Sequence, residues 1–365
     1  MSDIKLGNND ITLKVGSTDV DAIYLGSTLM YSGGTPPTPS YDTEYLTFVA
    51  TESGTFTFTP QNSNVISYST DNGTTWTEGN SVSVNANDKV LWKGTMTPAT
   101  NSGIGKFSST CAFTVEGNAH SLLWGDNFEG QTNLSSKKYA FDGLFSGCTG
   151  LTSAENMILP ATTLSNYCYA YMFSDCTSLT TAPELPATTL ASTCYGYMFN
   201  GCTSLTTAPV LSATTLAFSC YYYMFNACTN LTTAPVLSAT TLASYCYSNM
   251  FGGCTSLTTA PSLPATTLAN YCYSWMFSEC TSLTIAPVLS ATTLNTQCYY
   301  YMFYHCTRLN SITCLATNIS ASNCTTNWVT SVAANGTFTK ASSMNDWTTG
   351  VNGIPSGWTV QDYSS

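Results

Sequence analysis

Sixteen cysteines are the most reactive side chains of this 365-residue chain. Six of them fall 26 residues apart, namely Cys176, Cys202, Cys228, Cys254, Cys280 and Cys306. A second series with the same period is Cys168, Cys194, Cys220, Cys246, Cys272 and Cys298. No CxxC pair of the kind that binds zinc occurs, and the sequence carries no export signal that would lead to an oxidising compartment. The pattern therefore predicts buried, reduced thiols and no metal site.

Groups for acid–base or nucleophilic catalysis are scarce. His120 and His305 are the only histidines, and the HExxH, GxSxG, GxxxxGK[ST] and GxGxxG motifs are absent. Between residues 149 and 324 the acids are isolated from one another: Glu155, Asp175, Glu184 and Glu279. A glycosidase needs two carboxylates about 5–10 Å apart. Asp19 and Asp21 could hold a cation only weakly, and solvated acids are the alternative interpretation. We expect a protein that is not an enzyme and uses no cofactor.

The charge balance narrows the possible partners. The net charge is −11 with only nine basic residues, which disfavours binding to nucleic acid or to anionic membranes. No run of about 18 apolar residues could span a bilayer, and the amino terminus lacks the apolar segment of a secretory signal. From the sequence we expect synthesis in a cytoplasm without export. With 43% hydrophobic residues and 8% charged residues, the chain is predicted to fold.

The 26-residue period predicts a solenoid, because each unit must bury its apolar face against its neighbours. In the unit Cys202–Ala227, the first half has short Thr/Leu runs and a Pro, which suit a brief strand and a turn. In the segment 217–228 the apolar residues follow the spacing i, i+1, i+4, i+5 and i+8, which predicts one face of an amphipathic helix. The predicted fold class is an α/β repeat solenoid of the leucine-rich-repeat type, with a strand and a helix per unit.

Between these repeated positions, other residues of the predicted helix vary from unit to unit. Their palette of Tyr, Trp, Phe, Asn and Ser resembles that of binding loops. The candidate ligand-binding residues are Tyr197, Phe218, Tyr222, Tyr223, Tyr245, Asn249, Tyr271, Trp275, Tyr300, Tyr301 and Tyr304. A solvent-exposed face whose sequence varies without selection for binding should accumulate Lys and Glu. Glu279 is, however, the only charged residue among the variable positions. We expect a surface that recognises neutral glycans or a protein; drift and packing between subunits are the alternatives.

The rest of the chain is predicted to be β-structure and caps. Residues 1–32 alternate around short turns and suggest a small β docking module, and residues 33–40 form a Gly/Pro linker. Residues 41–138 indicate a small, immunoglobulin-like β-sandwich with strands at 45–50, 55–59, 65–69, 75–78, 81–84, 89–93 and 112–116. Residues 139–324 are the predicted solenoid, and the bulky residues of 325–365, including Trp328 and Trp358, are expected to close its core.

The repeat resembles a known family. The segments Cys-Thr-Ser-Leu-Thr-Thr-Ala-Pro-x-Leu and Met-Phe-x-x-Cys resemble the BspA-like leucine-rich repeats of bacterial surface proteins, in their 26-residue variant, over residues 139–325. The tail from Gly336 to Val360 is similar to the closing segment of such proteins from gut Bacteroidetes and their phages. The resemblance implies adhesion or binding to a host surface.

A weaker similarity concerns the amino terminus. The segment Lys5–Tyr31 resembles small β modules on structural proteins of gut phages, and a virion protein would need no export signal or lipobox. The resulting hypothesis is a virion protein that docks on a capsid or tail protein through residues 1–32, with the solenoid projecting as a fibre or decoration that contacts host glycans or proteins. The alternatives are a bacterial cell-surface adhesin exported by another route, and a structural decoration that packs against sister subunits as a homo-oligomer.

Overall fold

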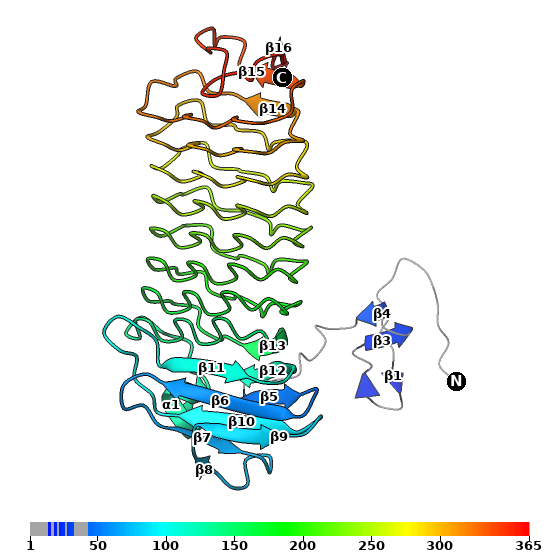
Figure 1. The fold of residues 1–365 in the computed structure, drawn as a ribbon, viewed down its shortest axis with the longest axis vertical. Coiled ribbons are helices and arrows are strands. Elements are labelled where there is room, and N and C mark those ends of the chain that lie inside the picture. Colours follow the sequence, from blue (N-terminus) through cyan, green and yellow to red (C-terminus); the bar gives the residue numbers. More distant parts are fainter. Residues whose placement is uncertain (1–13, 16–17, 20–21, 26–27, 33–42, 365) are drawn as a thin grey trace.

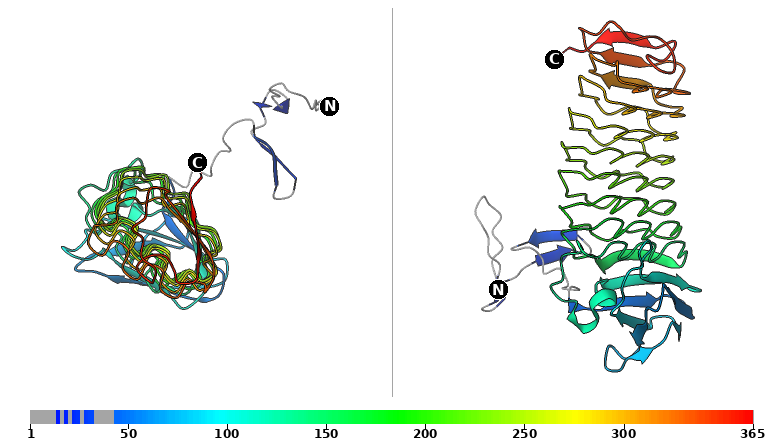
Figure 2. Two further views of the ribbon diagram at one scale, coloured as in Figure 1. Left: turned by 90° about the horizontal axis from the view of Figure 1, so that it is seen from above. Right: turned by 90° about the vertical axis from the view of Figure 1, so that its left-hand side faces the viewer.

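The computed structural model describes residues 14–15, 18–19, 22–25, 28–32 and 43–364. A β-structured end leads into a tall column of stacked coils, and a small sheet closes the far end (Figures 1 and 2). Near the amino terminus, two short antiparallel hairpins form, as the turn pattern there predicts. They consist of β1 (Lys14–Val15), β2 (Thr18–Asp19), β3 (Ala22–Leu25) and β4 (Thr28–Ser32).

Two sheets form the β-structured end. The larger has the strand order β13-β12-β5-β10-β7-β8 and the smaller β11-β6-β9. Their bounds are β5 Leu46–Ala50, β6 Gly54–Pro60, β7 Ile66–Ser69, β8 Thr77–Glu78, β9 Ser81–Val84, β10 Lys89–Gly94, β11 Gly105–Ser109, β12 Phe113–Asn118 and β13 Leu151–Ile158. Phe48 of β5 packs its ring 5.3 Å from that of Phe56 and 4.7 Å from that of Phe107, which joins the two sheets. All seven strands predicted here are confirmed, and the sequence missed β11 and β13.

The sheet continues into the first coil of the solenoid. Strand β13 pairs in parallel with β12, from Phe113↔Leu151 to Asn118↔Ile158. The short helices α1 (Ser121–Trp124) and η2 (Gly125–Asn127) follow β12 at this junction. One continuous cluster of buried apolar side chains then runs from Leu46 to Trp358. The β-structured end therefore covers the amino-terminal end of the solenoid core.

The coils contain no helix anywhere in the described segment 139–331, so the predicted strand-plus-helix unit is wrong. In the segment 217–228, alternate N–H groups close turns within the coil, as Tyr222 does to the carbonyl of Ser219 (3.1 Å). The N–H groups between them donate to the next coil, as Tyr223 does to the carbonyl of Ser248 (3.0 Å). The predicted brief strand is reduced in most units to single parallel bridges such as Thr207↔Thr233. The solenoid is a stack of turns.

A left-handed backbone residue recurs at every fourth position of these turns. In the unit described above they are Ser219 (φ 52°), Tyr223 (φ 56°) and Ala227 (φ 58°), and all the other units repeat the pattern. An α-helix has negative φ throughout, so these residues exclude it. The apolar positions also repeat every four residues, whereas a helical face repeats every 3.6 and would rotate by about 40° with each step of four.

Side chains alternate in pairs between the core and the outside. Phe225 stacks on Phe199 of the preceding coil with ring centroids 5.5 Å apart, and Tyr221 lies 5.9 Å from Tyr195. The thiol of Cys228 donates to the carbonyl of Phe199 (3.1 Å), a contact that recurs from coil to coil. All sixteen cysteines are free and buried, as the sequence pattern predicts for their burial. Desolvation raises the pKa of Cys228 to about 12, so the buried thiols stay protonated.

The carboxyl-terminal end is closed by a parallel sheet and large indoles. Strands β14 (Ser311–Cys314), β15 (Thr337–Lys340) and β16 (Thr359–Asp362) pair side by side. Trp328 is fully buried, donates from Nε1 to the carbonyl of Gly353 (2.9 Å) and stacks 5.6 Å from Trp347. These indoles lie where the sequence predicts a cap, whereas Val360 of β16 is 43% exposed.

The stacked core generates a stability prediction. Replacing Phe225 by Ala leaves a void between two stacked rings, and we expect the free energy of unfolding to fall by about 3–5 kcal/mol. Val236→Ala is the control, because this side chain is 76% exposed, and its effect should stay within ~0.5 kcal/mol. Urea titration of both variants measures the difference, and equal effects would contradict the assignment of the core.

His120 at the junction should make stability depend on pH. It is fully buried, Nδ1 lies 2.7 Å from the carbonyl oxygen of Gln131, and Nε2 has no partner among the described residues. Burial lowers its pKa from 6.5 to about 4, so the unfolded chain binds a proton at a higher pH than the folded chain does. Stability contributed by neutral His120 is present above pH 6.5 and is lost as the pH falls towards 4, by up to ~3 kcal/mol. Unfolding of the protein and of His120→Phe, measured from pH 7 to 4, should diverge; parallel curves would contradict the prediction.

Candidate functional site

Six of the left-handed positions form one line along the solenoid, which we call the outer column. Its members are Tyr171, Tyr197, Tyr223, Asn249, Trp275 and Tyr301, with φ between 54° and 58°. Left-handed backbone costs an L-residue about 1–2 kcal/mol, and bulky side chains rarely adopt it. Because hydrogen bonds to both neighbouring coils fix the turn, the backbone holds each of these side chains at its outer tip.

The rings of the outer column stack on one another. The centroids of Tyr171 and Tyr197 are 4.5 Å apart, those of Tyr197 and Tyr223 are 4.9 Å apart, and those of Trp275 and Tyr301 are 4.1 Å apart. The planes in these three pairs lie within 20° of parallel. Stacked rings have little freedom left to lose on binding a ligand, so the column is a preorganised surface.

A parallel line of left-handed residues lies four positions earlier in each unit, and we call it the flanking column. It contains Tyr139, Tyr167, Thr193, Ser219, Tyr245, Tyr271 and Gln297. Tyr139 stacks 4.9 Å from Tyr167, and Tyr245 stacks 4.3 Å from Tyr271. Sequence reasoning missed Tyr139, Tyr167 and Tyr171, although counting one unit back from Thr193 and Tyr197 reaches Tyr167 and Tyr171.

The remaining predicted residues surround these columns and touch them edge to face. Tyr222 lies 5.4 Å from Tyr197 and 6.4 Å from Tyr245, and Phe218 lies 5.7 Å from Tyr245. Tyr300 and Tyr304 lie 6.1 and 5.6 Å from Trp275 in the same way. The structure thus brings the predicted aromatic residues together, and we call them, with the two columns, the aromatic stripe. Phe218 is 52% exposed and most of the others are half-buried, whereas Asn249 is buried.

The stripe carries almost no charge. Desolvation, with the neighbouring phenols, raises the pKa of Tyr197 to about 12, so it stays neutral at physiological pH. Burial raises the pKa of Asp142, beside the amino-terminal end of the outer column, to about 6. Exposed Asp175 and Glu279 lie in a third left-handed column, four residues after the outer one.

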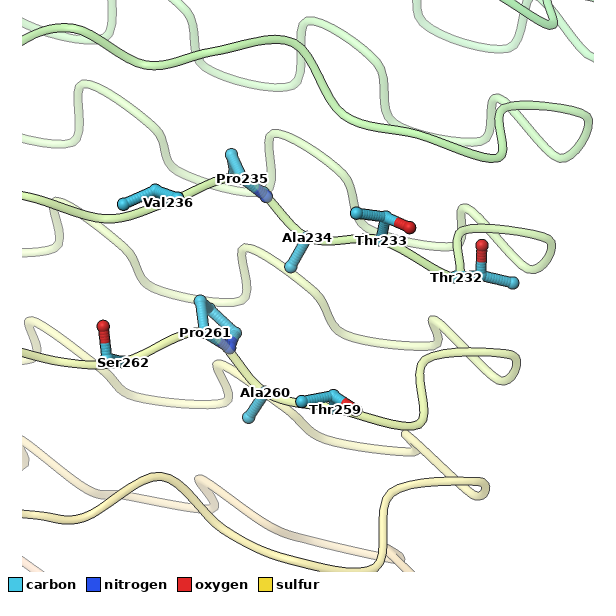
Figure 3. A pocket seen from close by; sticks show the side chains of 9 residues that line it. All are labelled: Thr232, Thr233, Ala234, Pro235, Val236, Thr259, Ala260, Pro261 and Ser262. Carbon is cyan, nitrogen blue, oxygen red and sulfur yellow. The ribbon is translucent and has the colours of Figure 1, made fainter. Parts of the chain in front are cut away.

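A second surface feature lies in the first half of the units. Shallow grooves separate successive Ala-Pro segments, as between Thr232–Val236 and Thr259–Ser262 (Figure 3). Similar grooves occur beside Pro209 and Pro287. Proline has no N–H to donate to the next coil, so the ladder of hydrogen bonds is interrupted there. Apart from Glu184 in the groove beside Pro209, their lining is apolar and hydroxylic, without the convergent polar groups of a small-molecule pocket.

The histidines and the possible metal ligands of the described residues do not form a metal site. His120 is enclosed at the junction, and His305 stacks on Tyr304 with centroids 4.0 Å apart. Across the described part of the chain, no three His, Cys, Asp or Glu side chains lie close enough together to hold a metal ion. Over the same residues, no helix is long and apolar enough to cross a membrane.

The repeat identifies the family. The model of the BspA type leucine-rich repeat region matches residues 132–250 and 247–344, with six copies. This covers more than half of the chain, and the protein belongs to that family. No curated protein and no solved structure gives a significant match.

The left-handed backbone of the outer column can be tested by substitution. Asn tolerates this conformation and already occupies the column at Asn249, so Tyr223→Asn should lower the free energy of unfolding by no more than about 1 kcal/mol. Tyr223→Val places a β-branched residue at the same φ and should cost at least ~1 kcal/mol more than Asn does. Thermal and urea unfolding measure the stability of the Asn and Val variants. Equal stability of the two variants would contradict the left-handed conformation of residue 223.

Proposed function

We propose that this protein is a non-enzymatic binding protein of the BspA-like repeat class, whose aromatic stripe adheres to a surface displayed by a host cell. The observation that supports this most strongly is the line of stacked rings at strained backbone positions. Bulky residues at positive φ cost stability, and such strain is concentrated at functional sites. Membership of the repeat family is consistent with a surface or binding protein.

The composition of the stripe favours a neutral partner. Tyrosine and tryptophan supply rigid contact area together with a polar edge, which suits neutral glycans or an uncharged protein surface. Since the stripe lacks basic residues, electrostatic attraction contributes little, and binding should depend weakly on salt. A change of less than about threefold in affinity between 50 and 500 mM NaCl is the expected result.

A bacterial cell-surface adhesin and a virion-attached protein both fit this proposal. The hairpins β1–β2 and β3–β4, followed by a Gly/Pro-rich segment, favour a carrier particle to which the amino terminus docks, such as a capsid or tail. Mass spectrometry of purified virions and of bacterial surface fractions distinguishes the two. Detection in virions supports the particle, and detection only on bacterial cells supports the adhesin.

Adhesion through the stripe is tested by removing its rings without disturbing the coils. The triple variant Tyr197→Asn, Tyr223→Asn and Trp275→Asn keeps residues that accept left-handed backbone, and we expect cell binding to weaken at least tenfold. The control is Thr207→Asn, Thr233→Asn and Thr259→Asn, three exposed positions in the first half of the units. Flow cytometry of labelled full-length protein on gut bacteria and epithelial cells provides the measurement. Equal binding by the two triple variants would exclude the stripe.

A further inference from the structure

The outer column is interrupted once, at Asn249. Tyr171, Tyr197 and Tyr223 stack before it, and Trp275 stacks with Tyr301 after it. On the faces that these rings turn towards Asn249, neither Tyr223 nor Trp275 makes a stacking contact with a described residue. The coil of Asn249 thus lacks the ring that its neighbours have.

The Asn249 side chain bonds to Asn226 of the preceding coil and does not occupy the position that a ring has in the neighbouring units. Its Oδ1 accepts from Nδ2 of Asn226 (3.2 Å), which also donates to the carbonyl of Gly252 (2.9 Å). A Cβ at residue 252 would overlap Oδ1 of Asn249, so glycine there makes this arrangement possible. By contrast, Asn327, which follows the outer column at the next left-handed position, donates to the hydroxyl of Tyr301 (2.7 Å) and caps the stack.

Two polar atoms of this amide pair remain without a protein partner. Asn249 is only 8% exposed, yet no described residue accepts a hydrogen bond from its Nδ2 or donates one to Oδ1 of Asn226. Neither of these two atoms is completely enclosed by the protein, so a ligand can still reach both from outside. One amide thus offers a donor and the other an acceptor, and a hydroxyl group can both donate and accept.

The spacing of the coils sets the size of the missing ring. Neighbouring coils pair like parallel strands, about 4.8 Å apart, so Tyr223 and Trp275 are separated by about 10 Å along the solenoid. A ring midway would lie about 5 Å from each, close to the 4.1–4.9 Å between stacked neighbours in the column. One six-membered ring fits this interval, with its edge towards the amides.

We propose that Tyr223, Trp275 and the Asn226–Asn249 amide pair form a binding site for one neutral pyranose of a glycan. A pyranose offers apolar C–H faces to the two aromatic rings and hydroxyl groups to the amides. A phenylalanine side chain of a protein would stack equally well but would leave the amide donor and acceptor unpaired, which is costly once they are desolvated. A tyrosine offers one hydroxyl group to the two amides, whereas a pyranose offers several around its edge. No lysine or arginine flanks the site, which selects against anionic sugars. This inference rests on the proposed function and names its ligand class.

The test places an aromatic ring at position 249, where the other units of the outer column already carry one. Asn249→Tyr should restore a continuous stack and abolish saccharide binding. Asn230→Tyr, which adds a tyrosine at an exposed position elsewhere in the repeat, is the matched control. The probes are neutral hexasaccharides of glucose, galactose and mannose, and N-acetyltyrosine amide for an aromatic side chain. Isothermal titration calorimetry of the full chain measures affinity, and circular dichroism establishes that each variant is folded.

Saturable binding of at least one hexasaccharide, weakened tenfold or more in Asn249→Tyr and unchanged in Asn230→Tyr, supports the site. Binding of none of the saccharides, equal affinity in both variants, or binding of N-acetyltyrosine amide alone overturns it. If Asn249→Tyr fails to fold, Asn226→Leu removes the amide acceptor instead, and the same outcomes apply. The proposed function is judged separately: loss of cell binding in the triple stripe variant, with saccharide binding unaffected by Asn249→Tyr, would overturn only the pyranose site.

Discussion

The alternation of backbone hydrogen bonds within and between coils is the constraint on which the rest of the structure depends. In the second half of each unit, one N–H closes a turn three residues back and the following N–H donates to the next coil. Buried amides are therefore satisfied without a helix or long strands. The arrangement repeats every four residues, sends side chains inward and outward in pairs, and requires positive φ at every fourth position.

The buried residues of the solenoid could be predicted from the sequence, but its backbone conformation could not. The core columns of Cys220, Tyr221, Met224 and Phe225 were identified correctly, because burial depends on apolar repetition alone. The same spacing suggested a helix, since four is close to 3.6 over a short segment. Strand β11 escaped prediction because it begins at Gly105, with φ 148°, and offers few apolar residues. Strand β13 escaped because it is held by a partner distant in sequence.

The candidate site was predicted as a set of residues but not as a geometry. Grouping the variable positions located the aromatic residues, and the structure shows that the outer column places them at left-handed positions in stacks. The role of Asn249 depends on hydrogen bonds to Asn226 and on the missing Cβ of Gly252, which no periodicity reveals. Gly and Asn share these left-handed positions with bulkier residues, at Gly201, Asn249, Gly253, Asn323 and Asn327, and they were the sequence signal for positive φ.

Cross-linking neighbouring coils tests the turn architecture most directly. Left-handed turns stacked about 5 Å apart allow a disulfide between Tyr197→Cys and Tyr223→Cys, whereas packed helices about 8–10 Å apart would prevent it. The native thiols are buried and do not compete. Mild oxidation followed by mass spectrometry should show this cross-link in the 197/223 pair and none in the pair Tyr197→Cys and Asn249→Cys, which is two coils apart. Absence of a disulfide in the folded 197/223 variant would contradict the account.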